Sequence, residues 1–251
     1  HLTVRDQEGS LKLDDVSFTA NSGEILGIAG ISGCGQKELL EAIAGLQPTE
    51  KGSIRYIEDD GTPEELIGKD PTAISGMGVS LSFVPEDRLG MGLVGSMDLT
   101  DNMMLRSFRK GRSWFTNRRE PKRLAEKVVK DLEVNTPGVS TPVRLLSGGN
   151  VQKVLVGREI AAAPTVLLTA YAVRGLDINA SYTIYDLINQ QKKAGVAVVF
   201  VGEDLDVLLE LCDRILVLCG GKVSGIVEKP DSSQKPEVGM MMTRLGGKKN
   251  G

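Results

Sequence analysis

The sequence is poor in histidine, cysteine and aromatic residues. Its only histidine is His1, so a mechanism that needs a histidine base, proton relay or metal ligand further along the chain has no residue to use. The three cysteines, Cys34, Cys212 and Cys219, are odd in number and widely spaced. This spacing argues against a disulfide framework or a zinc site and favours a reducing, cytosolic environment.

Further absences limit the class of protein. No apolar run approaches 18 residues and no signal peptide is recognisable, so we expect no membrane-spanning segment. The net charge of −3 and the isoelectric point near 5.4 argue against a general nucleic-acid-binding protein. The 251 residues suffice for one globular domain with an inserted lobe. Because the chain begins with His1 and enters patterned sequence almost at once, we expect it to be part of a longer polypeptide.

Hydrophobic patterning predicts strands that alternate with helices. The segments that predict strands are 11–18, 25–29, 52–57, 79–84, 165–169, 196–201, 214–218 and 222–227. Helices are predicted over 36–46, 151–163, 179–193, 204–212 and 236–245, with a charged helical lobe over 99–145 and a polar connection over 61–77. The strand at 196–201 is fully apolar, as in parallel sheets that helices cover on both faces.

A glycine-rich turn links the predicted strand 25–29 to its helix. This is the setting of a phosphate-binding loop, and the spacing Gly30-x-x-x-x-Gly35 matches that loop. The pattern then requires Lys followed by Ser or Thr, where this chain has Gln36 and Lys37. A Rossmann turn fails as well, because Gly33-x-Gly35 would need a small residue at Glu38. A tight strand-to-helix turn without a ligand is the alternative. The candidate nucleotide-binding residues are Gly30, Ser32, Gly33, Cys34, Gly35, Gln36, Lys37 and Glu38.

A second glycine motif, Leu146-Ser147-Gly148-Gly149-Asn150, stands where the helix 151–163 begins. Adjacent glycines let the backbone approach a ligand closely. Free N–H groups and the positive end of the helix dipole at such a position form an anion site. The alternative interpretation is a plain helix cap.

Three further motifs follow in a specific order. Pro85-Glu86-Asp87-Arg88 ends one predicted strand, Arg174-Gly175-Leu176-Asp177 follows another, and Glu203-Asp204-Leu205 follows a third. With the two glycine motifs, they resemble the nucleotide-binding domain of ABC transporters, most closely the second such domain in tandem ATPase subunits of bacterial nucleoside and simple-sugar importers. The resemblance implies an α/β fold, with a P-loop NTPase (RecA-like) core and antiparallel β lobe from 1–98 and 151–251, and an α-helical subdomain inserted at about 99–150.

In this family ATP lies between two domains that face head to tail, and each site combines one domain's phosphate loop with the other's LSGG signature. The resemblance implies that this chain's own site is degenerate. Gln36 stands where a lysine reaches the β- and γ-phosphates, and Lys37 stands where a hydroxyl ligates Mg²⁺. Ala170 replaces the Walker B aspartate, and Tyr171 replaces the general-base glutamate.

Two sensor positions are changed as well, because Glu86 replaces the Q-loop glutamine and Glu203 the switch histidine. Together the replacements imply no catalytic residue, no metal site and very slow or absent hydrolysis here. The backbone N–H groups of 32–36 remain, so we expect weak, metal-independent ATP binding.

The resemblance also implies an intact signature that this chain offers to a partner domain, together with a loop at the dimer seam. These residues are Ser147, Gly148, Gly149, Asn150 and Gln152 for the signature and Asp177 for the loop. ATP and Mg²⁺ are expected in that partner site. The implied partners are the first nucleotide-binding domain of the same polypeptide, the transmembrane permease subunits and, indirectly, a substrate-binding lipoprotein, with no nucleic acid. The implied location is peripheral, at the cytoplasmic face of the bacterial inner membrane.

Other functions stay open. The chain could be a scaffold or regulatory module that binds no nucleotide, or a self-sufficient ATPase in which Glu203 or Glu86 acts as the base. The stretch 106–123 is rich in Arg and Lys, with interleaved aromatic residues and one acid, Glu120. It could bind RNA, form a solvated helical face, or lie near the anionic leaflet where the family's helical lobe docks the permease.

Overall fold

The computed structural model describes residues 1–6, 8–106 and 118–244. They form two compact units. Unit 1 comprises His1–Leu81, Thr165–Tyr171 and Asn189–Gly251, and unit 2 comprises Ser82–Pro164 and Ala172–Ile188.

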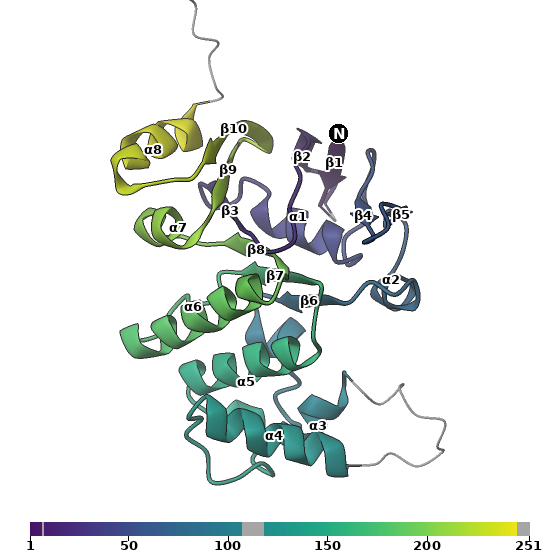
Figure 1. Cartoon of the computed structure of the whole chain (residues 1–251), viewed down its shortest axis with the longest axis vertical. Helices are drawn as coiled ribbons and strands as arrows, with labels where there is room; N and C mark the ends of the chain where they lie inside the picture. The colour runs from purple at the N-terminus through teal and green to yellow at the C-terminus, as the bar shows by residue number, and fades with distance from the viewer. Residues whose placement is uncertain (7, 107–117, 245–251) are drawn as a thin grey trace, which may run out of the picture. The chain divides into compact units, whose positions relative to one another are not determined.

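Unit 1 carries most of the strands. Its described elements are β1 (Leu2–Arg5), β2 (Leu11–Val16), β3 (Ile25–Gly30), α1 (Gln36–Ile43), β4 (Arg55–Ile57), β5 (Pro63–Glu65), α2 (Pro71–Gly76), β7 (Val166–Ala170), β8 (Ala197–Val201), α7 (Leu205–Leu211), β9 (Arg214–Cys219), β10 (Lys222–Glu228), the 3₁₀ turn η3 (Ser232–Gln234) and α8 (Lys235–Thr243) (Figure 1).

The central sheet has the strand order β10-β9-β3-β8-β7-β6. Strand β6 is Leu81–Val84, of which only Leu81 belongs to unit 1. Strand β3 runs parallel to β8 and β9, β7 runs parallel to β8, and β10 is antiparallel to β9. All five residues of β8 are buried, as its apolar sequence predicts. In Figure 1, α1 lies on one side of these strands, and α7 and α8 lie on the other.

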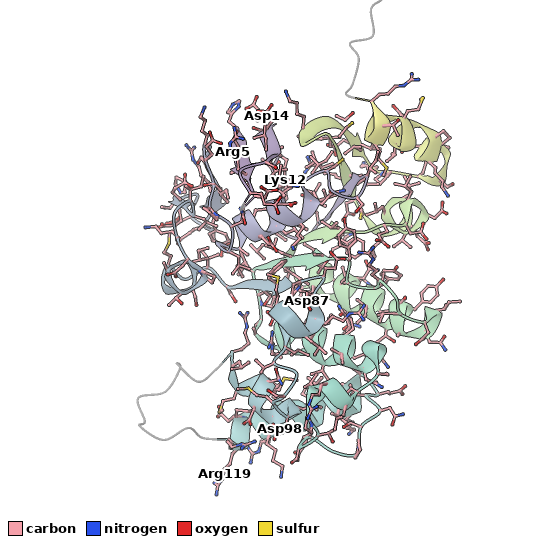
Figure 2. The ribbon with its side chains drawn as sticks, turned by 180° about the vertical axis from the view of Figure 1, so that it is seen from behind. Arg5, Lys12, Asp14, Asp87, Asp98 and Arg119 are labelled. Atoms are coloured by element: carbon pink, nitrogen blue, oxygen red, sulfur yellow. The ribbon has the colours of Figure 1, made fainter. Side chains whose placement is uncertain are left out.

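Two smaller antiparallel pairs complete unit 1, β1 with β2 and β4 with β5. Figure 2 marks Lys12 and Asp14 on β2. The sequence did not predict β1, and it did not predict β5 or α2 because 61–77 was expected to be a polar connection. For α2 a signal was present. The Asp70 carboxylate accepts a hydrogen bond from the Ala73 N–H (2.8 Å), and Pro71 occupies the first helical position, which is a usual helix start.

Unit 2 is mainly helical, and the described residues of the range 99–150 lie within it. Its elements, besides the end of β6, are the π-helical turn η1 (Arg88–Gly92), α3 (Leu99–Met104), α4 (Arg119–Asp131), the 3₁₀ turn η2 (Val143–Leu145), α5 (Gly148–Ala161) and most of α6 (Ile178–Lys193). Helices α4 and α5 pack closely at Gly157, where a Cβ would lie 2.7 Å from the Val128 Cγ1. None of the described helices has the length and hydrophobicity that crossing a bilayer requires. Residues 107–117 of the basic stretch lie outside the described residues.

The contact between β3 and α7 gives a test of the packing in unit 1. A Cβ at Gly27 would lie 2.7 Å from the Cys212 Sγ and 3.1 Å from the Leu208 Cδ2. Gly27→Ala should therefore lower the free energy of unfolding by about 1–3 kcal/mol through overpacking. The matched control is Gly239→Ala in α8, where no atom lies within 4 Å of the new Cβ. It should raise stability by about 0.5–1 kcal/mol. Urea denaturation of both variants measures the difference, and equal effects would contradict this packing.

Candidate functional site

The glycine loop of unit 1 connects β3 to α1 and requires glycine at its last position. Gly35 precedes the helix with φ +96°, a left-handed conformation. A Cβ there would lie 2.5 Å from the Lys12 carbonyl oxygen and 2.5 Å from the Leu13 Cδ2. Gly33 also has a positive φ, +85°, but faces open space. The sharp turn therefore brings the start of α1 close to β2.

The first turn of α1 leaves backbone donors available. Among the described residues, the N–H groups of Gln36, Lys37 and Glu38 have no hydrogen-bond acceptor, and the first bond into the helix is from the Leu39 N–H to the Gly35 carbonyl (2.9 Å). Unpaired N–H groups at a helix start attract anions. The loop thus keeps the backbone part of an anion site.

The side chain of Gln36 folds back into the loop. It is 2% exposed, and its Nε2 donates a hydrogen bond to the Ile31 carbonyl at 3.1 Å. It also packs against Gly30, where a Cβ would lie 2.6 Å from that Nε2. Position 36 therefore presents a neutral amide that is engaged with the loop itself, and no cation for a phosphate.

Lys37 points along the helix surface. Its Nζ lies 3.7 Å from the Glu41 carboxylate, one helical turn further on, and its side chain is half-exposed. Burial raises the pKa of Glu41, and the Lys37 charge opposes this rise. The position that would carry a hydroxyl for a metal ion therefore holds a cation paired with a neighbouring acid.

The ends of β7 and β8 offer no clustered carboxylates. Ala170 closes β7 beside Val201 and is 1% exposed. Tyr171 follows with φ +51°, and its N–H donates to the Val201 carbonyl at 2.9 Å. Glu203 is exposed beyond β8. Across 1–6, 8–106 and 118–244, no group of three His, Cys, Asp or Glu side chains could hold a metal ion.

In unit 2 the second glycine motif forms the start of α5. Ser147 is the N-cap, and its Oγ accepts from the Asn150 N–H (3.4 Å) and from the Asn150 Nδ2 (2.9 Å). The Asn150 Oδ1 in turn accepts from the Asn135 N–H at 3.0 Å, a contact that the sequence did not predict. Ser147 and Gly148 are exposed at the surface of unit 2.

The loop before α6 lies beside this motif. The Asp177 Oδ1 accepts from the Ala180 N–H at 2.9 Å and so caps α6. A Cβ at Gly149 would lie 3.8 Å from the Asp177 Oδ2, so the predicted seam residue and the signature glycines are neighbours. Gln152 differs from the other predicted signature residues. It is 1% exposed, and neither atom of its amide has a hydrogen-bond partner in the structure. The helix turns about 100° per residue, which carries it away from the Ser147 face.

Glu86 and Arg88 both reach the segment before α6 in unit 2. The Glu86 carboxylate forms an ion pair with the Arg174 guanidinium, and the Arg88 Nη2 donates to the Arg174 carbonyl. Glu86 therefore has a cationic partner within its own unit. The sequence gave no sign that Glu86 would pair with Arg174, because the two residues are 88 positions apart in the chain.

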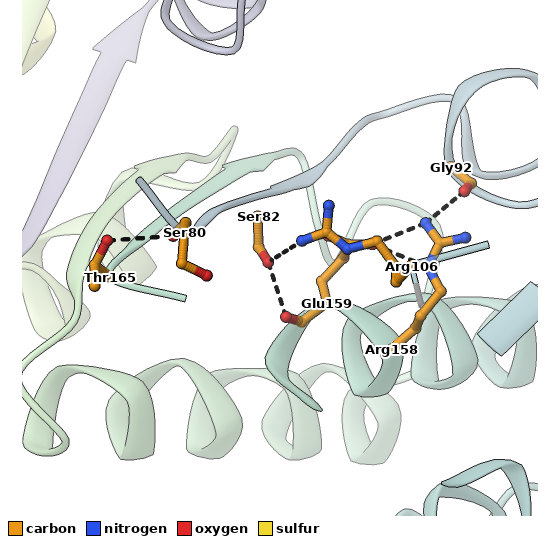
Figure 3. A network of polar contacts seen from close by, with 7 residues as sticks. All are labelled: Ser80, Ser82, Gly92, Arg106, Arg158, Glu159 and Thr165. Atoms are coloured by element: carbon orange, nitrogen blue, oxygen red, sulfur yellow. Dashed lines mark hydrogen bonds and ion pairs between the residues drawn. The ribbon is translucent and has the colours of Figure 1, made fainter. Parts of the chain in front are cut away.

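A buried polar network supports α5 further along (Figure 3). The Arg158 Nη2 donates to the Gly92 carbonyl at 2.7 Å and lies 2.8 Å from the Glu159 carboxylate, which is 3% exposed. The Ser82 Oγ donates to the Glu159 carbonyl at 2.8 Å, and the Arg106 Nη2 lies 3.3 Å from the Glu159 carboxylate. Buried charges of this kind are tolerated when they are paired and hydrogen-bonded. The network joins β6, η1 and the residue Arg106, which follows α3, to the helix that Ser147 caps.

A comparison with known families matches residues 13–169 to the family described as ABC transporter. The chain belongs to the ABC transporter family. Similar curated members include the guanosine import ATP-binding protein NupO of Bacillus subtilis, 33% identical over 257 residues that cover 100% of this chain and 49% of that protein. The ribose import ATP-binding protein RbsA 1 of Rubrobacter xylanophilus is 34% identical over 231 residues, which cover 91% of this chain and 45% of that protein. The chain thus spans about half the length of these relatives.

Solved ABC cassettes share the fold. A dimeric ATP-binding cassette in a post-hydrolysis state, bound to ADP and Pi, superimposes with a TM-score of 0.76 at 23% identity, over 91% of this chain and 96% of that one. A nucleotide-free cassette from an ABC transporter gives a TM-score of 0.73 at 19% identity, over 95% of this chain and 94% of that one. These likenesses confirm the predicted α/β fold with a P-loop NTPase core.

The cysteine environments give a test of the loop. Burial raises the pKa of the Cys212 thiol, the Asp213 carboxylate adds to the rise, and Lys192 opposes it. Cys34, in the glycine loop, and Cys219 are half-buried. Since the thiolate is the reactive form, iodoacetamide at pH 8 should label Cys34 and Cys219 well before Cys212. Mass spectrometry of quenched samples measures the order, with Cys34→Ser as the control. Labelling of Cys212 as fast as Cys34 would contradict the described burial.

Proposed function

We propose that this chain is a nucleotide-binding domain of a bacterial ABC importer for nucleosides or simple sugars. In this proposal it completes the ATP site of a partner domain and hydrolyses little or no ATP at its own loop. The observation that carries the proposal is the contrast between its two helix starts. At α5, Ser147 and Gly148 are exposed and ready to meet a ligand, while at α1 the buried Gln36 amide turns inward to the Ile31 carbonyl.

The chemistry of the chain's own loop supports weak hydrolysis. Phosphoryl transfer relies on cations and a metal ion that neutralise developing charge. Here position 36 is a neutral amide, and Lys37 is paired with Glu41. Mg²⁺ prefers oxygen ligands such as carboxylates, and Ala170 supplies no side-chain oxygen. The residues present therefore do not fit Mg²⁺ at this loop, and we assign the metal ion to the partner site.

Nucleotide binding is a separate matter from hydrolysis. The unpaired N–H groups of Gln36, Lys37 and Glu38 keep an attraction for phosphate. The proposal therefore includes weak, metal-independent ATP binding at Gly30–Glu38. It assigns Ser147–Asn150 and the loop at Asp177 to the partner's ATP.

The assembly is inferred from the family and from the names of the relatives. The relatives are named as import ATP-binding proteins for guanosine and for ribose. We infer that the partners are a first nucleotide-binding domain in the same polypeptide, transmembrane permease subunits and, indirectly, a substrate-binding lipoprotein. The proposed location is the cytoplasmic face of the bacterial membrane, with the helical subdomain at about 99–150 nearest the permease.

Nucleotide titration distinguishes this proposal from the other two functions. We expect ATP to bind to the chain with a dissociation constant that changes less than about threefold when Mg²⁺ is replaced by EDTA, and without turnover. Isothermal titration calorimetry and phosphate release measure the two quantities. Absence of binding would favour the scaffold. Mg²⁺-dependent turnover would favour a self-sufficient ATPase, in which Glu203 or Glu86 would have to act as the base.

Substitution in the assembled importer ATPase tests the shared site. Ser147→Arg should lower the rate of ATP hydrolysis at least about 100-fold, because it removes a hydroxyl that donates a hydrogen bond to phosphate and places a bulky side chain in the signature. Lys37→Ala should change the rate less than about twofold, because its exposed pairing with Glu41 is weak. Ser140→Arg, at another exposed serine of unit 2, is the matched control and should behave like the parent protein. The reverse ranking of Ser147→Arg and Lys37→Ala would overturn the proposal.

A further inference from the structure

We propose that Arg88 is a further phosphate-contacting residue of the ATP site that the signature completes. The inference rests on the proposed function, in which Ser147–Asn150 face a partner's nucleotide. It adds a cation from η1, a segment that the signature motif does not include. The ligand group is a terminal phosphate of a nucleoside triphosphate.

The backbone around Arg88 is held firmly at its start. Asp87, labelled in Figure 2, caps η1, since its Oδ1 accepts from the Gly90 N–H at 2.8 Å and from the Leu89 N–H at 3.3 Å. A Cβ at Gly90 would lie 2.0 Å from the Asp87 Oδ2, so this cap needs glycine at position 90. The Arg88 carbonyl accepts from the Leu93 N–H at 2.7 Å. The direction in which Arg88 leaves the backbone is therefore fixed.

The other end of η1 is fastened to α5, the helix that begins at the signature. The Gly92 carbonyl accepts from Arg158, which is 7% exposed. A Cβ at Gly92 would lie 2.8 Å from the Leu155 Cδ2, so the two segments touch directly. Arg158 is itself held by the buried Glu159 (Figure 3). Arg88 and the signature consequently belong to one connected structure within unit 2.

The Arg88 side chain reaches the signature itself. Its Nη2 donates to the Arg174 carbonyl, and its Nη1 would lie 3.3 Å from a Cβ at Gly148. One edge of the guanidinium is thus anchored on the loop before α6. The Nη1 edge lies against the first signature glycine, where the missing side chain leaves room for a ligand oxygen.

The Arg88 guanidinium has no acidic partner in the part of the chain that the structure describes. Among the described residues no carboxylate lies within ion-pair distance of Arg88, and the nearby Glu86 is paired with Arg174. Burial lowers the pKa of Arg88, yet an arginine stays charged at any pH at which proteins fold. The cation stands beside the positive end of the 14-residue helix α5. The N–H groups of Gly148 and Gly149 there have no acceptor in the described chain.

An anion at this position would accept hydrogen bonds from these unpaired donors and would balance the charge of Arg88. A phosphate group there can accept from the Arg88 Nη1, from the backbone N–H groups of Gly148 and Gly149 and from the Ser147 hydroxyl. A hydrogen bond from a guanidinium to a phosphate is charge-assisted and therefore stronger than one between neutral groups. The pairing of Glu86 with Arg174 keeps an anion away from Arg88 and so leaves it available.

Two substitutions in the assembled importer ATPase test the role of Arg88. Arg88→Gln keeps a donor for the Arg174 carbonyl but removes the charge, and should raise the KM for ATP about tenfold, as expected for one lost charge-assisted hydrogen bond. Arg88→Lys restores the charge without the planar fork and should give an intermediate KM. Arg123→Gln, at an exposed arginine on α4, is the matched control and should leave the KM unchanged.

Thermal denaturation of each variant separates binding from folding. An unchanged melting temperature with a raised KM supports the inference. A KM for Arg88→Gln within twofold of the parent value, in a folded protein, overturns it. If Ser147→Arg abolishes hydrolysis while Arg88→Gln has no effect, the role of Arg88 fails and the proposed function stands. If Ser147→Arg is fully active, both fail.

Discussion

The constraint on which this structure depends is that two helix starts leave their first N–H groups unpaired: α1, which follows a glycine turn, and α5, whose first two residues are glycines. Unpaired N–H groups need an acceptor, and the positive end of the helix dipole at the same position further favours an anion. At α1 the left-handed Gly35 makes the turn possible, and at α5 the Ser147 cap fixes it. The rest of each unit, the buried parallel strands in one and the packed helices in the other, holds these two helix starts in place.

The two starts differ in what surrounds them. At α1 the nearby polar side chains satisfy one another, since Gln36 bonds to the loop and Lys37 pairs with Glu41. Near the start of α5, Glu86 forms its ion pair with Arg174, and in the described part of the chain no carboxylate pairs with Arg88. Both helix starts therefore offer unpaired N–H groups, but only the one in unit 2 has a cation beside it that no described acid pairs with. This difference supports our proposal that the domain serves a neighbour's nucleotide more than its own.

Much of the fold was predictable because the patterns are strong. Fully apolar β8 and the glycine loop before α1 were located to within a few residues, since burial on both faces and a left-handed turn restrict the sequence severely. The misses were short elements. Strand β1 has four residues, too few for a clear alternation, and α2 was missed although Asp70 and Pro71 marked its start. The predicted site residues lie at the starts of α1, α5 and α6 and at or after the ends of β6, β7 and β8, but their side-chain directions were not predictable.

The sequence by itself determined which chemical groups are available: a glutamine and a lysine after the glycine loop, an alanine at the end of β7, and a serine with two glycines at a helix start. It determined their secondary structure as well, because helix periodicity and glycine conformations are local properties. Only the tertiary structure decided that Gln36 turns inward, that Gln152 is buried, and that Arg88 reaches the signature while Glu86 does not accompany it. These outcomes depend on contacts between residues far apart in the chain, and no local pattern records which of several nearby partners a long polar side chain will take.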